Sequence, residues 1–307
     1  FDLQRELAMR MNFADRPGKS AVERFMHYYF LQATQVGSLT GMFLAQLDEQ
    51  SARQKLGFFA ALRQRRKRKS GVFPVQADKI SAGGDDFFRQ DPVRLLEMFV
   101  VADREGMEIH PEAMRLARRD VALIDADVRK DPRANALFLD LLTSRHDPET
   151  VLRWMSEAGI FGRFVPDFGR VIAQMQFDMY HHYTVDEHTI RAIGLLSRLE
   201  KGSEAEQHPL ASEVIGKIAS RRVLYVATLL HAIAKGRRGD HSVLGAEIAM
   251  KLCPRLGMSP AETELTAWLV RWHLLMSATA FKRDLADYKT IADFSAMVQS
   301  QERLRLL

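Results

Sequence analysis

Apolar residues recur at helical spacing along almost the whole chain, and this pattern limits most strongly the folds open to it. Alternation of period two, bounded by turn residues, occurs at most near residues 71–80. A long helix is expected over residues 21–47, with Ser20 as its N-cap. Four further helices each have a proline near the first turn, where its missing N–H is tolerated, at residues 92–105, 111–125, 132–143 and 148–159. The sequence therefore predicts an all-α fold.

The chain has 307 residues, 47% of them hydrophobic, which is long enough for two compact domains. A polar, basic and glycine-bearing excursion over residues 49–86 interrupts the helices and has room for a short hairpin. Residues 159–174 are typical of a loop, because Gly162 and Pro166 break the helical pattern. We expect the domain boundary there, with domains at residues 1–165 and 166–307. Because the chain opens on Phe1 and stops within a helical pattern, we expect it to be a portion of a longer protein.

The net charge of +5 is due in part to a basic run at residues 63–69. We interpret this run as a solvated loop, and we expect no nucleic-acid partner. No apolar run approaches the roughly 20 residues that span a bilayer, and no signal segment opens the chain, so we expect a soluble, cytoplasmic protein with no membrane partner. Since Cys253 is the single cysteine, any metal would be held by histidine and carboxylate.

Four histidines in the C-terminal part fall on the apolar stripes of four different expected helices: His188, His231, His241 and His273. Thr184 and Glu187 have the spacing of a capping box, which predicts that a helix begins near His188. His231 belongs to a helix expected over residues 222–235, and His273 to a stripe that runs on to Met276. We therefore expect all four imidazoles to point inward.

Several buried imidazoles need partners. A single inward histidine is more often a hydrogen-bonded core residue than a ligand. Burying several neutral imidazoles without partners costs on the order of 1–3 kcal/mol each, whereas a shared divalent ion uses their lone pairs. The small residues Gly245, Ala246 and Ala249 would let the helices approach closely enough for the side chains to converge. Four such histidines together favour a metal site.

The segments around these histidines resemble a known family. The sequence reads MYHHYTVDEH at residues 179–188, LHAIAKG at 230–236, GDHSVLGA at 239–246 and RWHLLMS at 271–277. These segments look like the HD-type domain of the bacterial PII uridylyltransferase/uridylyl-removing enzymes. Upstream, VERFMHYYF at 22–30 and DFFRQDP at 86–92 look like the helical segment that follows the nucleotidyltransferase core of that family. The resemblance covers nearly the whole chain.

The resemblance implies an HD-type helical phosphohydrolase domain preceded by a helical segment of the nucleotidyltransferase portion. Proteins of this family attach UMP to a tyrosine of the PII signalling protein when glutamine is low and remove it when glutamine is high, and the HD domain performs the removal. The expected partners are therefore PII and UMP or UTP, with glutamine acting through regions outside this chain. No glycine-serine phosphate turn with paired carboxylates occurs in the sequence, so we expect no UMP transfer by this chain alone.

By resemblance, the metal ligands are His188, His231, His241 and His273, and the ion is Mg²⁺ or Mn²⁺. The aspartate of the HD motif belongs at position 232, where this chain has Ala232. Lys235, with Arg237 and Arg238, is a candidate for contacting phosphate, the alternative being a solvated turn. Asp240 is a candidate for orienting a water or an imidazole, the alternative being a helix N-cap. A last acidic ligand is expected beyond Leu307 or at Asp284 or Asp287, which alternatively serve as loop and cap residues.

Ala232 changes the expected chemistry, because a methyl group has no lone pair for a metal. We expect metal affinity and turnover to be strongly reduced, so that the chain is an inactive variant of a hydrolase. Two alternatives stay open. The chain is either a catalytically dead scaffold that binds PII or a nucleotide, or a different HD-type nucleotide phosphohydrolase.

Overall fold

A computed structural model describes residues 2–55, 69–175 and 183–307. It is mostly helical, as predicted, and it divides into two compact units, Phe1–Asp186 and Glu187–Leu307. The boundary expected after residue 165 lies inside the first unit. Nearly all of the basic run at 63–69 lies outside the described residues. None of the described helices is both long enough and apolar enough to cross a membrane.

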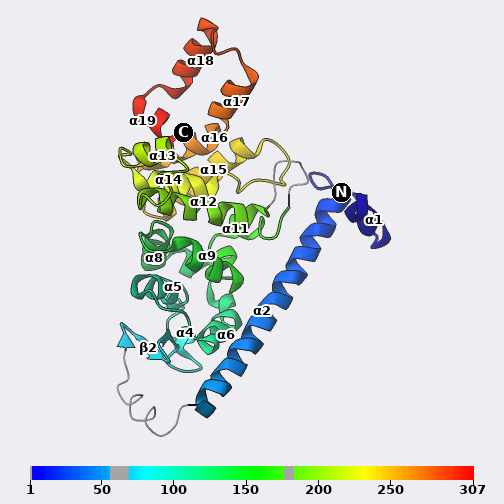
Figure 1. Cartoon of the computed structure of the whole chain (residues 1–307), viewed down its shortest axis with the longest axis vertical. Helices are drawn as coiled ribbons and strands as arrows, with labels where there is room; N and C mark the ends of the chain where they lie inside the picture. Colours follow the sequence, from blue (N-terminus) through cyan, green and yellow to red (C-terminus); the bar gives the residue numbers. More distant parts are fainter. Residues whose placement is uncertain (1, 56–68, 176–182) are drawn as a thin grey trace. The chain divides into compact units, whose positions relative to one another are not determined.

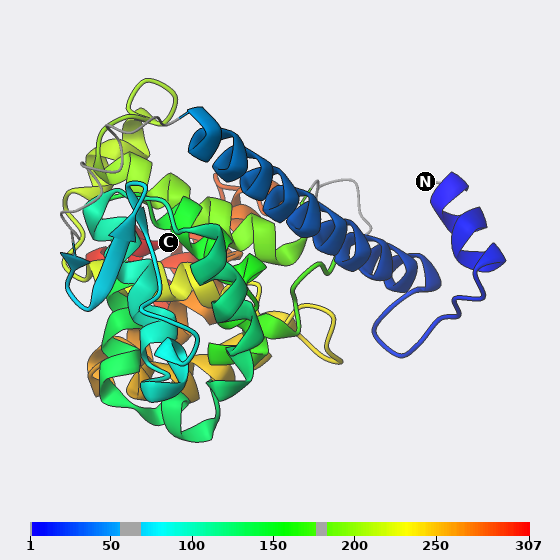
Figure 2. The same cartoon turned by 90° about the horizontal axis from the view of Figure 1, so that it is seen from below.

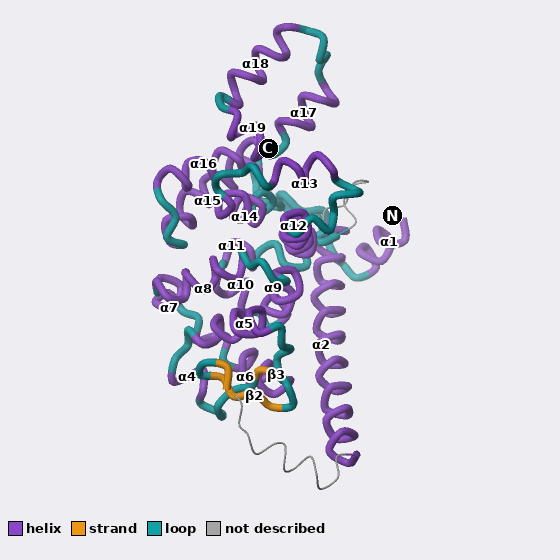
Figure 3. Tube along the Cα trace, turned by 60° about the vertical axis from the view of Figure 1, so that its left-hand side comes forward, coloured by secondary structure: helices purple, strands orange, loops and turns teal. Residues whose placement is uncertain are grey.

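The first unit begins with α1 (Asp2–Arg10) and the long α2 (Ala21–Lys55). Figure 2 shows α2 in blue as one uninterrupted helix, separate from α1. Ser20 caps α2 as predicted: its hydroxyl accepts from the Glu23 N–H at 3.3 Å, and the Glu23 carboxylate accepts from the Ser20 N–H at 2.8 Å. The strands are β1 (Lys69–Ser70), β2 (Phe73–Gln76) and β3 (Lys79–Ile80), which form an antiparallel sheet in that order, orange in Figure 3. The hairpin expected near residues 71–80 is therefore present.

The remaining helices of this unit are short. They are α4 (Phe87–Gln90), α5 (Arg94–Glu105), α6 (Pro111–Arg119), the 3₁₀ turn η1 (Val121–Leu123), α7 (Ala126–Lys130), α8 (Pro132–Leu142), α9 (Pro148–Glu157), α10 (Ile160–Phe164) and α11 (Pro166–Gly169). Three of them begin at the predicted prolines. The prediction of one helix over 111–125 was wrong, because Asp120 ends α6 and the Asp125 carboxylate accepts from the Asp127 and Val128 N–H groups to start α7.

Residues 159–174 were expected to be a loop, and this expectation was also wrong. Phe161 and Phe168, from α10 and α11, are fully buried and stack at 3.9 Å between ring centroids. Gly162 and Gly169 permit this crossing, since a Cβ on Gly162 would lie 2.9 Å from the Gly169 Cα. The glycine that suggested a loop serves close backbone packing in the core of the first unit.

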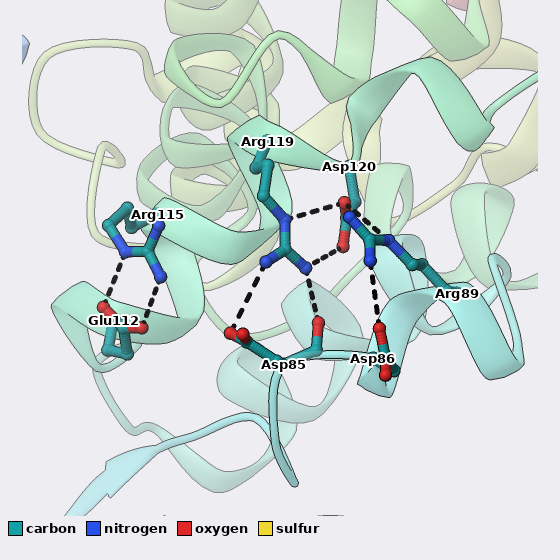
Figure 4. Close-up of polar contacts among 7 residues, drawn as sticks. All are labelled: Asp85, Asp86, Arg89, Glu112, Arg115, Arg119 and Asp120. Carbon is teal, nitrogen blue, oxygen red and sulfur yellow. Dashed lines mark hydrogen bonds and ion pairs between the residues drawn. The ribbon is translucent and has the colours of Figure 1, made fainter.

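A network of charged side chains ties α4 to α6 in the first unit (Figure 4). Asp120 is 5% exposed, and its two carboxylate oxygens accept from Arg119 at 2.9 and 2.7 Å. The Arg89 Nε lies 3.6 Å from the same carboxylate, and Arg119 also bonds to Asp85. The Arg119 hydrogen bonds hold the pKa of Asp120 below its ordinary value. Asp120 is therefore a buried anion with two cationic partners.

The second unit holds the four histidines. Its helices are α12 (Val185–Glu200, which starts at the boundary), α13 (Pro209–Ile215), α14 (Arg221–Leu230), α15 (His241–Arg255), α16 (Pro260–Trp272), α17 (Leu275–Lys282), α18 (Tyr288–Val298) and α19 (Gln301–Leu306). Helices α14, α15 and α16 pack on one another (Figure 1). Gly245 makes the packing close, because a Cβ there would lie 2.8 Å from Val270 Cγ1 on α16 and 3.4 Å from the Leu230 carbonyl oxygen.

Candidate metal centre

The four histidines predicted to converge form a continuous cluster of rings. His188 and His231 lie closest, with 3.1 Å between their Nε2 atoms and 5.2 Å between ring centroids. The His231 ring lies 5.5 Å from that of His273, which lies 5.4 Å from that of His241. The structure thus brings together side chains that are up to 85 residues apart in the sequence. We call these four residues the histidine cluster.

Helix ends, rather than helix interiors, present these side chains. His188 lies in the first turn of α12 and His241 is the first residue of α15, whereas His231 and His273 are the C-cap residues of α14 and α16. All four are half-buried. The histidine cluster is therefore not part of a fully closed apolar core.

The prediction of a helix through residue 235 was wrong, since α14 ends at Leu230. Beyond it the chain turns, with the Ile233 N–H donating to the Leu230 carbonyl and the Lys235 N–H to the Ala232 carbonyl, up to Gly236 at φ 74°. The stripe expected to continue to Met276 also breaks, because α16 ends at Trp272 and α17 begins at Leu275. Apolar residues in these turns imitate a helical stripe in the sequence; those after α14 are buried, whereas Leu274 and Met276 after α16 are exposed.

Backbone carbonyls set the tautomers of two rings. His231 Nδ1 lies 2.7 Å from the Thr228 carbonyl oxygen, and His273 Nδ1 lies 2.8 Å from that of Val270. A carbonyl oxygen only accepts, so each Nδ1 carries the proton and each Nε2 keeps its lone pair. In the contact between His188 and His231, the His188 Nε2 then donates the proton. A carbonyl that holds Nδ1 in this way is the usual support of a histidine ligand.

The surroundings favour the neutral form of two of the rings. Burial, followed by the nearby rings of His188 and His273 and the Lys235 ammonium, lowers the pKa of His231 to about 3. Burial also lowers the pKa of His273. The neutral imidazole is the form that binds metals, so His231 and His273 have the charge state that a metal ligand requires.

The spacing of the closest pair fits two neighbouring ligands of one ion. Two nitrogens about 2.1 Å from an ion and about 90° apart lie roughly 3.0 Å from each other, close to the 3.1 Å between His188 and His231. Among residues 2–55, 69–175 and 183–307, no group of three or more His, Cys, Asp or Glu side chains is placed to hold a metal as it stands. The donors therefore fit a divalent ion in chemistry and in one spacing, with a third donor still to be brought in.

Position 232, adjacent to His231, is where the resemblance led us to expect a carboxylate. Ala232 is fully buried and lies in the turn that follows α14. Its methyl group has no lone pair with which to bind an ion. A carboxylate at position 232 would be directly adjacent in sequence to His231 and is our candidate for the third donor.

The other expected site residues differ in their exposure to solvent and in their hydrogen-bond partners. Lys235 is 9% exposed, and its ammonium lies near enough to His231 and His273 to lower the pKa of both. Asp240 is exposed and caps α15, accepting from the Ser242 and Val243 N–H groups at 2.7 and 3.4 Å. Arg237 is half-buried and Arg238 is exposed. Asp284 and Asp287 are both exposed and accept from the Ala286 and Lys289 N–H groups.

Sequence reasoning missed a second polar group that joins α12 to α14. Arg221 donates to both carboxylate oxygens of Glu200, at 2.6 and 2.7 Å, and the Tyr225 hydroxyl donates to Glu200 at 2.8 Å. The Arg221 guanidinium also lies over the Tyr225 ring, 4.5 Å from its centroid. No sequence pattern identified this group, because Glu200 and Arg221 meet only when α12 and α14 pack together.

Comparison with known proteins matches three family models along the chain. Residues 1–44 match a model described as GlnD PII-uridylyltransferase, and residues 73–164 match the third domain of uridylyltransferase GlnD. Residues 185–303 match the HD domain, which contains the whole histidine cluster. HD domains are metal-dependent phosphohydrolases, which supports a divalent metal cofactor.

Curated relatives match over the full length of the chain. It is 80% identical to a bifunctional uridylyltransferase/uridylyl-removing enzyme of Novosphingobium aromaticivorans, and 62% identical to one of Erythrobacter litoralis. A protein of the same description from Azospirillum brasilense is 52% identical. All of this chain is covered in each case, but only 34%, 34% and 33% of the respective relatives. The chain thus spans about a third of the length of the curated relatives it matches.

Proposed function

Since this chain belongs, as a segment, to the family of bifunctional uridylyltransferase/uridylyl-removing enzymes, we propose that the histidine cluster is its site for removing uridylyl groups. The substrate is the PII signalling protein carrying UMP on a tyrosine. The reaction is hydrolysis of a phosphodiester: water adds to phosphorus, the bond to the tyrosine oxygen breaks, that oxygen takes up a proton, and UMP is released.

One observation carries this proposal, the contact of 3.1 Å between the Nε2 atoms of His188 and His231 within a cluster of four neighbouring rings. His188, His231, His241 and His273 would hold Mg²⁺ or Mn²⁺. A bound divalent ion supplies polarisation of the phosphoryl oxygens and a lowered pKa for the attacking water. The Thr228 and Val270 carbonyls keep the Nε2 lone pairs of His231 and His273 available.

The charged residues around the cluster suit a phosphodiester substrate. Lys235 provides a positive charge beside His231 and His273, where it can stabilise the negative charge that develops on the phosphoryl oxygens. Asp240 uses one carboxylate oxygen as a helix cap, which fixes the start of α15 and with it His241. We assign Asp240 this positioning role, and Lys235 the binding of phosphate.

Ala232 should reduce the activity of this chain in the removal of uridylyl groups. Without a carboxylate at position 232, the cluster offers only neutral nitrogen donors, and a divalent ion there has no charge neutralisation from its ligands. We therefore propose that metal affinity and turnover are both low. Uridylyl transfer and the response to glutamine are assigned to other parts of the longer relatives.

The proposal is tested by UMP release from uridylylated PII, followed by chromatography, with this chain and its Ala232→Asp variant in Mn²⁺. We expect the variant to be at least about tenfold faster, on the scale of the losses that follow from disturbing a metal centre. Adding His231→Ala to the variant should abolish the gain. Equal rates for the parent chain and the Ala232→Asp variant would contradict the assignment.

Ala232 itself favours a second candidate function, a non-catalytic scaffold that binds PII. Binding of uridylylated PII to the parent chain, measured by titration without added metal, distinguishes the two. Tight binding together with no UMP release from either variant would support the scaffold.

A further inference from the structure

Glu200, Arg221 and Tyr225, which we call the Glu200 clamp, form the polar joint between α12 and α14. The joint is made of two parallel hydrogen bonds from a guanidinium and one from a phenol, all to a single carboxylate. Tyr225 is fully buried, and the side chains of Glu200 and Arg221 are 22% and 24% exposed. Forked, partly buried pairs of this kind are geometrically specific, unlike exposed single contacts.

The Glu200 clamp and the His188–His231 contact lie at opposite ends of the same two helices. Glu200 is the last residue of α12 and lies about 18 Å along the axis from His188, at a rise of about 1.5 Å per residue. Arg221 is the first residue of α14, whereas His231 is its C-cap. The contacts pair the start of each helix with the end of the other, so the two helices run antiparallel and are held at two points.

Helix stability alone does not explain the two charges of the Glu200 clamp. A carboxylate at the C-terminal end of a helix and a cation at the N-terminal end are both disfavoured by the helix dipole. Glu200 ends α12 and Arg221 begins α14, so each stands at the unfavourable end of its own helix. Their pairing across the two helices offsets both penalties. The residues therefore act on the tertiary arrangement of α12 and α14.

We propose that Glu200 is a positioning residue, which sets the register of α12 against α14 and thereby holds His188 Nε2 against His231 Nε2. The effect of Glu200 on turnover rests on the function proposed above, because the distance between His188 Nε2 and His231 Nε2 affects turnover only if the two nitrogens bind a metal. Ligand atoms must be correct to within about 0.2 Å to bind a metal. One contact would leave the helices able to slide or pivot, and two contacts about 18 Å apart prevent both.

The positioning role is tested first without metal, in the chain as it stands. A proton held in a hydrogen bond between two imidazoles is protected from exchange with water and gives its own downfield resonance in the proton spectrum of ¹⁵N-histidine-labelled protein. We expect this resonance in the parent chain and its loss in Glu200→Gln. The double variant Glu200→Arg with Arg221→Glu rebuilds the ion pair with its charges exchanged, and should restore the resonance.

The matched control is Glu213→Gln, which removes an equally short ion pair, 2.6 Å from Glu213 to Lys217, that is local to the C-terminal end of α13 and joins no second helix. It should leave the resonance unchanged. Persistence of the resonance in Glu200→Gln would overturn the proposal, and so would a loss that the exchanged pair does not restore.

A second measurement separates this proposal from the proposed function. In the Ala232→Asp background, Mn²⁺ affinity should fall about tenfold with Glu200→Gln, and recover with the exchanged pair. If the Ala232→Asp chain binds no Mn²⁺ while the resonance follows the expected pattern, the metal centre is wrong and the positioning role stands. If Mn²⁺ binds equally well with and without Glu200→Gln, the positioning role is wrong and the metal centre stands.

Discussion

At position 232 a methyl group fills a site with no solvent exposure, directly after a histidine whose Nδ1 is fixed by a carbonyl. A carboxylate placed there has to lose its water, which is unfavourable unless a cation or hydrogen-bond donors replace that water. The histidine cluster has one ring nitrogen acting as a donor toward another ring, and Lys235 close by. The natural compensation for a carboxylate at 232 is therefore a bound cation.

A prediction about stability follows for Ala232→Asp. Without metal the variant should unfold at a lower urea concentration than the parent chain, because the new carboxylate is buried without a full set of partners. With Mn²⁺ the loss should be recovered, since an ion that binds only the folded state stabilises it. Urea unfolding followed by circular dichroism, with and without Mn²⁺, measures both. A variant whose unfolding midpoint does not respond to Mn²⁺ would count against a ligand role for residue 232.

Asp120 gives a prediction about pH in the first unit. Arg119 holds the pKa of its buried carboxyl below the unfolded value of about 3.9. The stabilisation is therefore complete above that value and is lost as the pH falls through the folded pKa. Asp120→Asn should lower the urea midpoint clearly at pH 7, and the difference from the parent chain should shrink as the pH is lowered below about 4.

The control for Asp120 is Asp86→Asn. The Asp86 carboxylate accepts a hydrogen bond from Arg89 at 3.0 Å (Figure 4). Its side chain is 65% exposed, so water screens the ion pair, and replacing Asp86 should have little effect on stability. A difference between Asp120→Asn and the parent chain that stays the same from pH 7 to well below the unfolded pKa of about 3.9 would show that ionisation of Asp120 is not the cause.

At the scale of elements, close packing of α15 on α16 depends on Gly245. A methyl group there would lie 2.8 Å from Val270 Cγ1, so Gly245→Ala forces the helices apart. We expect a loss of about 1–3 kcal/mol in the free energy of unfolding, measured in urea. Gly216→Ala is the control, because nothing lies within 4 Å of its added Cβ and its φ is −69°. It should be neutral or slightly stabilising, by up to about 1 kcal/mol. Similar losses at both positions would contradict the packing argument.

Sequence pattern predicted which helices exist far better than where they end. Prolines at residues 111, 132 and 148 mark helix starts because local chemistry decides them. The ends of α14 and α16 escaped prediction, because apolar residues after Leu230 and Trp272 continue the helical period in the sequence while the backbone turns. Gly162 was misleading for a similar reason, since glycine marks both loops and close crossings. Tertiary packing decided these cases.

The candidate metal site was also predictable only in those parts that do not depend on tertiary packing. Inward spacing and the family resemblance together identified the four histidines, and the structure brings them together. The carbonyl partners of His231 and His273 and the Glu200 clamp could not be predicted, because they depend on how helices distant in sequence are oriented. The role of the four histidines as ligands stays a prediction.

At the scale of the whole molecule, the histidine cluster lies entirely within the second unit, Glu187–Leu307. The same residues are matched by the HD domain, whereas the first unit is matched by uridylyltransferase domains. A chain that spans about a third of the length of its relatives therefore contains all four histidines of the proposed centre. The proposed removing reaction is thus to be tested on this chain itself.

The central claim is that four histidines form a metal centre that lacks one carboxylate at position 232. Calorimetric titration with Mn²⁺ of the parent chain, of Ala232→Asp, and of Ala232→Asp with His231→Ala tests it most directly. We expect Ala232→Asp to bind Mn²⁺ at least about tenfold more tightly than the parent chain, and we expect that gain to be lost when His231 is replaced. Equal Mn²⁺ affinity in all three proteins would contradict it.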